Sequence, residues 1–151
     1  MNKFTEYEQR SLFIQSFNQK ESNLYCEIPV FCRSVDLVRH DIIGQTISAI
    51  EFKTTNWKRA IEQVLEVSIS FDFLEICIIE PKTNKAKSQI IDSCSNLGIG
   101  LYFFNQESTT FSHTVESQKV KNSWGLQKKS VMRFIREVDN NGRQSIAITS
   151  L

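Results

Sequence analysis

Apolar and polar residues follow one another along this chain with two different periods. Some stretches repeat apolar residues at helical spacing, while shorter runs rich in β-branched and aromatic residues are typical of strands. The expected helices are residues 5–18, 57–70, 83–96 and 128–138, and the expected strands are residues 24–31, 33–38, 46–52, 71–81 and 98–104. The pattern predicts the core order α-β-β-β-α-β-α-β, followed by a C-terminal helix.

This order of elements predicts an α/β fold with a mixed sheet flanked by helices. Strands that follow one another directly favour antiparallel hairpins, whereas a strand, helix and strand favour a parallel crossover. Pro29 lies in the first expected strand and indicates that this strand is at an edge or irregular. We expect residues 1–104 to form the core domain. Residues 105–151 are expected to form a polar connector, over 105–125, and a C-terminal helix packed on the core.

The third expected strand ends in the sequence IEFK, where two charged side chains share one face. Side chains alternate along a strand, so Glu51 and Lys53 point to the same side. A tight turn near Ile43 and Gly44 would place Asp36, on the preceding strand, directly opposite Glu51. Two carboxylates at that spacing are able to share one cation, whereas a slip of one residue would send Asp36 to the other face.

The E-x-K spacing alone leaves two interpretations open. One is a cation site, and the other is a salt bridge on a solvated sheet face. The same spacing occurs again at Glu80 and Lys82, where no acidic partner on a hairpin is identified. The wider sequence around the first copy therefore has to decide between the two interpretations.

That wider sequence resembles the PD-(D/E)XK nuclease superfamily, which has the restriction-endonuclease-like fold. The matching features are Asp36 in R-x-x-D-L-V, Glu51 and Lys53 in I-E-F-K, and the following phrase N-W-K-R-A-I-E-Q. The resemblance covers residues 5–104 and adds nothing on the last part of the chain. Val35 stands where the proline that names the superfamily would be, so the motif is incomplete there.

The resemblance implies a role for each matching residue. Asp36 and Glu51 would bind Mg²⁺ or Mn²⁺, and Lys53 would be the catalytic lysine. Gln63, in the helix after this strand, would face the site, although an exposed or helix-capping role is an equal alternative. Glu27 and Glu8 would add acidic groups, but Glu8 also completes a capping box at the start of the first helix.

Residues around the expected site have side chains suited to nucleic acid. Arg33, Lys58 and Arg59 are expected to contact phosphates, and Trp57 is able to stack on a base or sugar. The alternative for Trp57, which we favour, is that the indole anchors its helix on the sheet.

Charge and composition limit the classes of protein that are compatible with this chain. The 18 basic and 17 acidic side chains give a net charge of +1, so the total charge is no argument for a nucleic-acid partner. No apolar run is long enough to span a bilayer, and we expect a cytoplasmic protein with no membrane contact. The four cysteines are scattered and are expected to be core thiols, not zinc ligands.

Together these features predict a Mg²⁺- or Mn²⁺-dependent nuclease whose substrate is nucleic acid, with DNA as the first expectation. A non-catalytic nucleic-acid-binding or assembly module of the same fold is the alternative, and a plain α/β interaction domain is a third. Because the chain is small and nearly neutral, we expect it to need a homodimer or a partner subunit to hold a substrate.

Overall fold

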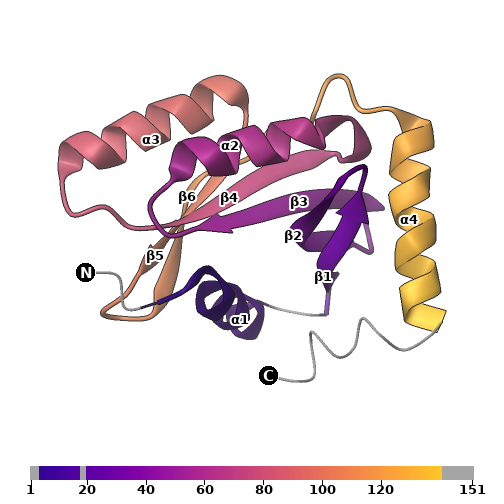
Figure 1. The fold of residues 1–151 in the computed structure, drawn as a ribbon, viewed down its shortest axis with the longest axis horizontal. Coiled ribbons are helices and arrows are strands. Elements are labelled where there is room, and N and C mark those ends of the chain that lie inside the picture. Colours follow the sequence, from indigo (N-terminus) through magenta and orange to yellow (C-terminus); the bar gives the residue numbers. More distant parts are fainter. Residues whose placement is uncertain (1–3, 18–19, 141–151) are drawn as a thin grey trace.

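The computed structural model describes residues 4–17 and 20–140. These residues form a six-stranded mixed sheet with helices on both faces (Figure 1). This confirms the predicted α/β class. The helices are α1 Glu6–Ser16, α2 Trp57–Glu66, α3 Asn84–Leu97 and α4 Gly125–Asn140, with a 3₁₀ turn at Ser68–Ser70. The strands are β1 Ser22–Val30, β2 Arg33–Asp41, β3 Thr46–Lys53, β4 Phe73–Ile79, β5 Gly100–Asn105 and β6 Thr110–Val115.

The strands lie in the sheet in the same order as in the chain, from β1 to β6. β1, β2 and β3 are antiparallel neighbours, β3, β4 and β5 are parallel, and β6 is antiparallel to β5. α2 and α3 make the two parallel crossovers, as the strand–helix–strand pattern predicted. β1, which contains Pro29, is an edge strand, also as predicted.

The predicted connector over residues 105–125 is wrong in one respect, because it contains the strand β6. Phe111 pairs with Phe104 and Ser112 pairs with Phe103, so β6 extends the sheet beyond the strand that was expected to be the last. The side chains of β6 are mostly exposed, and only Phe111 and Val115 are partly buried. An edge strand of this polarity lacks the apolar alternation by which a strand is recognised.

The helices divide between the two faces of the sheet. α1 lies on one face, over an apolar cluster that includes Phe13, Phe52 and Phe104. α2, α3 and α4 pack against the other face, where α4 contributes the buried side chains Val131 and Ile135 (Figure 1). The C-terminal helix is therefore part of the core packing. The end of the predicted C-terminal segment, residues 141–151, lies outside the described residues.

Local sequence signals account for where several helices begin and end. Thr5 and Glu8 form the predicted capping box of α1, Asn56 caps α2, and Thr83 caps α3. α3 ends at Gly98, whose φ of 71° is in the left-handed region that favours glycine. Within residues 4–17 and 20–140, no helix has the length and apolarity that a membrane crossing requires.

Candidate functional site

The β2–β3 hairpin brings two acidic side chains together. Leu37 pairs with Ile50 and Val38 with Ala49, which is the register that the tight turn predicted. The same register, continued by one residue, places Asp36 beside Glu51. The Asp36 carboxyl is close enough to raise the pKa of Glu51. The sequence thus predicted the register of this hairpin.

Glu51 is almost completely buried, with 1% of its side chain exposed. It lies on the sheet face that α2 covers, and its Oε1 accepts a hydrogen bond from Arg33 Nη2 at 2.9 Å. Burial and the neighbouring Asp36 carboxyl raise the pKa of Glu51 well above its usual range, against the opposing charges of Arg33 and Lys53. A half-buried Asp36 beside a buried Glu51 favours a shared proton or a bound cation.

Asp36 has a second contact, which fixes its carboxylate at the end of the hairpin. Asp36 Oδ2 accepts a hydrogen bond from the backbone N–H of Phe52 at 2.9 Å, beyond the last regular pair of β2 and β3. On its other side, the pairing of β1 and β2 is interrupted at Glu27, which has a φ of 55°. The carboxylate therefore lies where the ladders on both sides of β2 are irregular.

Lys53 lies at the end of β3 and is held by α1. Its Nζ is 3.2 Å from Glu6 Oε1, and its backbone oxygen accepts a hydrogen bond from Gln9 Nε2 at 3.4 Å. The sequence pointed to Glu8 as the first-helix acid, but Glu8 accepts a hydrogen bond from the Thr5 backbone in the capping box. Glu6, one of two acidic residues in the first turn, carried no motif that would have singled it out.

A small cavity of about 200 Å³ opens beside Asp36 on the side of α1. Glu27, predicted as an additional acid at the mouth of the site, lines it together with Arg10. Arg10 Nη1 forms an ion pair with Glu27 and donates to the backbone oxygen of Asp36 at 3.2 Å. Arg10 is a second residue that the sequence did not identify, because its contacts join segments distant in the chain.

The arginines predicted to contact phosphates are occupied by carboxylates. Arg33 pairs with Glu66 at 3.1 Å as well as with Glu51, and Arg59 pairs with Glu62 at 3.0 Å on the surface of α2. Both guanidinium groups are therefore paired with carboxylates of the protein. Their contact with phosphates of a substrate stays a prediction.

Three further candidates lie on α2. Trp57 packs partly buried against the core cluster, as the anchoring interpretation predicted, and Lys58 Nζ lies 5.5 Å from the centre of its ring. Gln63 Oε1 is buried and has no hydrogen-bond partner among the described residues. An unpaired buried amide oxygen is uncommon, since burial removes its water without compensation.

A buried ion pair that the sequence did not predict lies on the opposite sheet face. Glu75 of β4 pairs with Arg39 Nη1 at 2.8 Å, and it is adjacent to Ile50 in the ladder, not to Glu51. Burial raises the pKa of Glu75, and Arg39 opposes that effect. Gly100 leaves the space for this carboxylate, since a Cβ there would lie 3.1 Å from Glu75 Oε2.

The donors at the β2–β3 end suit a hard cation in their chemistry. Proteins usually bind Mg²⁺ through one or two carboxylates, and water molecules fill the other coordination positions. Among residues 4–17 and 20–140, no group of three or more His, Cys, Asp or Glu side chains is placed to hold a metal. A cation here would depend on Asp36 and Glu51, with its remaining ligands from water or the backbone.

Comparison with known proteins identifies the fold and no activity. No family model and no curated protein matches the chain. Among solved structures, a protein of unknown function from Silicibacter pomeroyi is similar, with a TM-score of 0.68 and 10% sequence identity. The likeness covers 97% of this chain and 93% of that one. It supports the α/β architecture over nearly the full length of both proteins.

Proposed function

We propose that this chain is a divalent-metal-dependent nuclease of the restriction-endonuclease-like fold, which hydrolyses phosphodiester bonds of nucleic acid, with DNA as the first candidate substrate. The observation that carries the proposal is the convergence of the Asp36 and Glu51 carboxyl groups on the hairpin that ends at Lys53. Glu51 is buried and Asp36 is half-buried beside it, and a bound cation would offset the cost of ionising both carboxyl groups.

In the proposed reaction, Asp36 and Glu51 would hold Mg²⁺ or Mn²⁺. When bound, the cation would lower the pKa of its water and offset the charge of a phosphate. The Lys53 ammonium lies at the end of β3 and stabilises the charge that develops on the phosphate oxygens. Glu6 orients that ammonium, and Arg33 holds the Glu51 carboxyl in place.

A second candidate is a non-catalytic nucleic-acid-binding or assembly module with the same fold. Two contacts favour it: Arg33 already neutralises Glu51, and Glu6 already pairs with Lys53. In such a module, these charges would serve to join β2, β3 and α1. For either function, the net charge of +1 gives little general electrostatic attraction for a nucleic acid. We therefore propose that a second copy of the chain or another subunit contributes to substrate binding.

The nuclease proposal is tested by cleavage of defined substrates. The purified chain is incubated with single- and double-stranded DNA and RNA, with Mg²⁺, with Mn²⁺ or with a chelator. We expect metal-dependent cleavage that falls at least ~100-fold in Asp36→Asn and in Lys53→Gln, the scale of loss when a catalytic group is removed. Asn keeps an oxygen that accepts from the Phe52 backbone, so Asp36→Asn preserves the hairpin contact.

Matched controls are Asp92→Asn on α3 and Lys129→Gln on α4, which change the same kinds of charge on exposed positions away from the site. Both are expected to cleave like the unmodified chain. Cleavage that survives Asp36→Asn and Lys53→Gln would rule out this site. No cleavage of any substrate, with binding retained, would support the non-catalytic module.

A further inference from the structure

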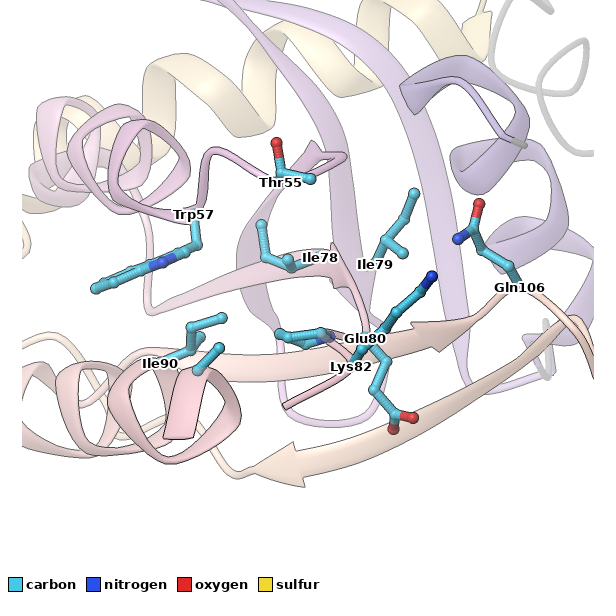
Figure 2. A pocket seen from close by; sticks show the side chains of 10 residues that line it. Thr55, Trp57, Ile78, Ile79, Glu80, Lys82, Ile90 and Gln106 are labelled. Carbon is cyan, nitrogen blue, oxygen red and sulfur yellow. The ribbon is translucent and has the colours of Figure 1, made fainter. Parts of the chain in front are cut away.

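A second pocket lies on the other side of the end of β3, between α2 and α3 (Figure 2). Its volume is about 280 Å³, and its floor is formed by Ile78 and neighbouring residues at the end of β4. β3 and β4 are parallel, so this is the edge at which their carboxyl ends meet.

The walls of this pocket suit a flat aromatic group. Trp57, at the start of α2, and Ile90, on α3, approach the pocket from its two helices, and Ile78 lies between them on the sheet (Figure 2). The volume is near the lower end of the range of about 300 to 1,000 Å³ that ligand pockets occupy. A single base would fit such a space better than a larger ligand, and its π-face would stack on the indole.

The rim of the pocket adds positive charge to these apolar walls. Lys82 lines the pocket, and Lys58 lies over the Trp57 ring. Lys85 and Lys87 belong to the first turns of α3, which has no acidic residue in its first turn. Glu80, which also lines the pocket, pairs with Lys87 at 3.7 Å, so these two charges offset each other. Lys82, on the lining itself, is the cation that would meet a phosphate, and it makes a nucleotide a better fit than a neutral aromatic molecule.

The position of the pocket connects it with the proposed nuclease site. Thr55, which lines the pocket, follows Lys53 by two residues, and Thr54 joins the two strands by accepting a hydrogen bond from the Ile79 backbone at 3.2 Å. The Lys53 ammonium pairs with Glu6 of α1, on the other face of the sheet, so a polynucleotide would cross the edge of the sheet at the end of β3 to bring a neighbouring base to this pocket. The base would have to be unpaired, because a base that enters a pocket between two helices has to leave its partner and its stack.

We infer that this pocket holds one unpaired base of the substrate, stacked on Trp57, with the adjoining phosphate near Lys82. The inference rests on the proposed function and narrows it to single-stranded or locally opened nucleic acid. It also gives a role to Lys82 of the second E-x-K sequence, while Glu80 of that sequence pairs with Lys87.

Fluorescence of Trp57 tests the inference without metal and without cleavage. The chain contains two tryptophans, so Trp124→Phe leaves Trp57 as the reporter. In a chelator, we expect saturable quenching by short oligothymidylate DNA and by the matched oligouridylate RNA, and weaker quenching by a blunt DNA duplex. Lys82→Gln should weaken binding and reduce the slope of log affinity against log salt by about one, as expected for one lost phosphate contact.

The controls separate the pocket from general binding. Lys129→Gln, on α4, should leave the affinity unchanged, and Trp57→Phe, which retains Trp124, should lose the quenching while it keeps the thermal transition of a folded protein. Quenching that is absent, or equally strong with the duplex, overturns the inference. Metal-dependent cleavage without quenching would leave the nuclease proposal standing and remove this pocket from it. Quenching by single strands without any cleavage would support the base pocket and count against the nuclease proposal.

Discussion

At the scale of single residues, the buried charge of Glu51 is the feature with the widest consequences. Its carboxyl group is 1% exposed and contacts both Asp36 and Arg33. Asp36 favours the protonated form of Glu51, and Arg33 favours the ionised form. Because burial adds to the effect of Asp36, the folded protein holds the proton of Glu51 more tightly than the unfolded chain does.

This difference predicts how stability depends on pH in the absence of metal. Above the ordinary glutamate pKa of 4.5, the unfolded chain loses the Glu51 proton while the folded protein keeps it. The free energy of unfolding therefore falls as pH rises from that value towards the raised pKa of the folded state. In Glu51→Gln this contribution is absent, so the variant should gain stability relative to the unmodified chain between about pH 5 and about pH 8.

Urea denaturation at several pH values, in a chelator, measures this change. Glu116→Gln, an exposed glutamate, is the matched control and should follow the unmodified chain. Parallel curves for Glu51→Gln and the unmodified chain would show that the folded protein does not hold this proton, and would remove the argument for a cation-seeking acid pair.

The residues of the candidate site were predictable to different degrees. The short turn after β2 fixed the pairing that brings Asp36 to Glu51, since register is a property of adjacent segments. Strand alternation predicted that Lys53 would share the face of Glu51, but its ammonium pairs with Glu6 of α1. The contacts of Glu6 and Arg10 come from α1, far away in the chain. No local pattern specifies how a helix rotates on a sheet, so these partners required the structure.

At the scale of secondary-structure elements, β5 shows how a strand depends on its neighbour across the ladder. Gly100 begins β5 and pairs with Glu75 of β4, whose buried carboxylate fills the space in front of it. A glycine in a strand interior usually weakens the strand, but close approach of another group explains its presence. The sequence suggested only a turn before this strand, because Glu75 was not identified as a buried charge.

Gly100→Ala should therefore destabilise the protein. The added Cβ would lie 3.0 Å from Glu75 Cγ and 3.2 Å from Ser117 Cβ, so side chains or backbone would have to shift. We expect a loss of about 1–3 kcal/mol in the free energy of unfolding, which is the usual cost of overpacking. Urea denaturation measures it. The control is Gly125→Ala at the start of α4, where an added Cβ meets nothing within 4 Å and stability should hold or rise.

Equal stability of the two alanine variants would mean that the sheet gives way at Gly100 without cost. It would also mean that the Glu75–Arg39 pair is not held tightly against β5.

At the scale of the whole molecule, α4 joins the two ends of the described chain. Ile135 and Val131 lie in the core cluster beneath the helix, and Asp139 accepts a hydrogen bond from the Tyr25 hydroxyl of β1 at 3.0 Å. At the other end of α4, Lys128 Nζ is 2.8 Å from the buried Asp72 carboxylate. Helical periodicity predicted α4, but its place against β1 depends on tertiary contacts.

Ile135→Ala tests whether α4 is part of the cooperative unit. Ile135 is 1% exposed, and removal of its buried methyl groups should cost about 2–5 kcal/mol of stability. Leu126→Ala, at a side chain that is 63% exposed on the same helix, should change the stability by less than about 0.5 kcal/mol. Denaturation followed by fluorescence and by circular dichroism measures both. A small effect of Ile135→Ala would place α4 outside the core.

The strand order, in which every strand lies beside its neighbours in the chain, also has a consequence for the path of folding. Most of the sheet can grow from short-range pairings, each of which closes only a modest loop. The contact between β1 and α4 is different, because Tyr25 and Asp139 are separated by 114 positions. Closure of so long a loop carries a larger entropic cost and is expected late on the pathway. The stability lost in Ile135→Ala should then appear mainly as faster unfolding, while the folding rate changes little.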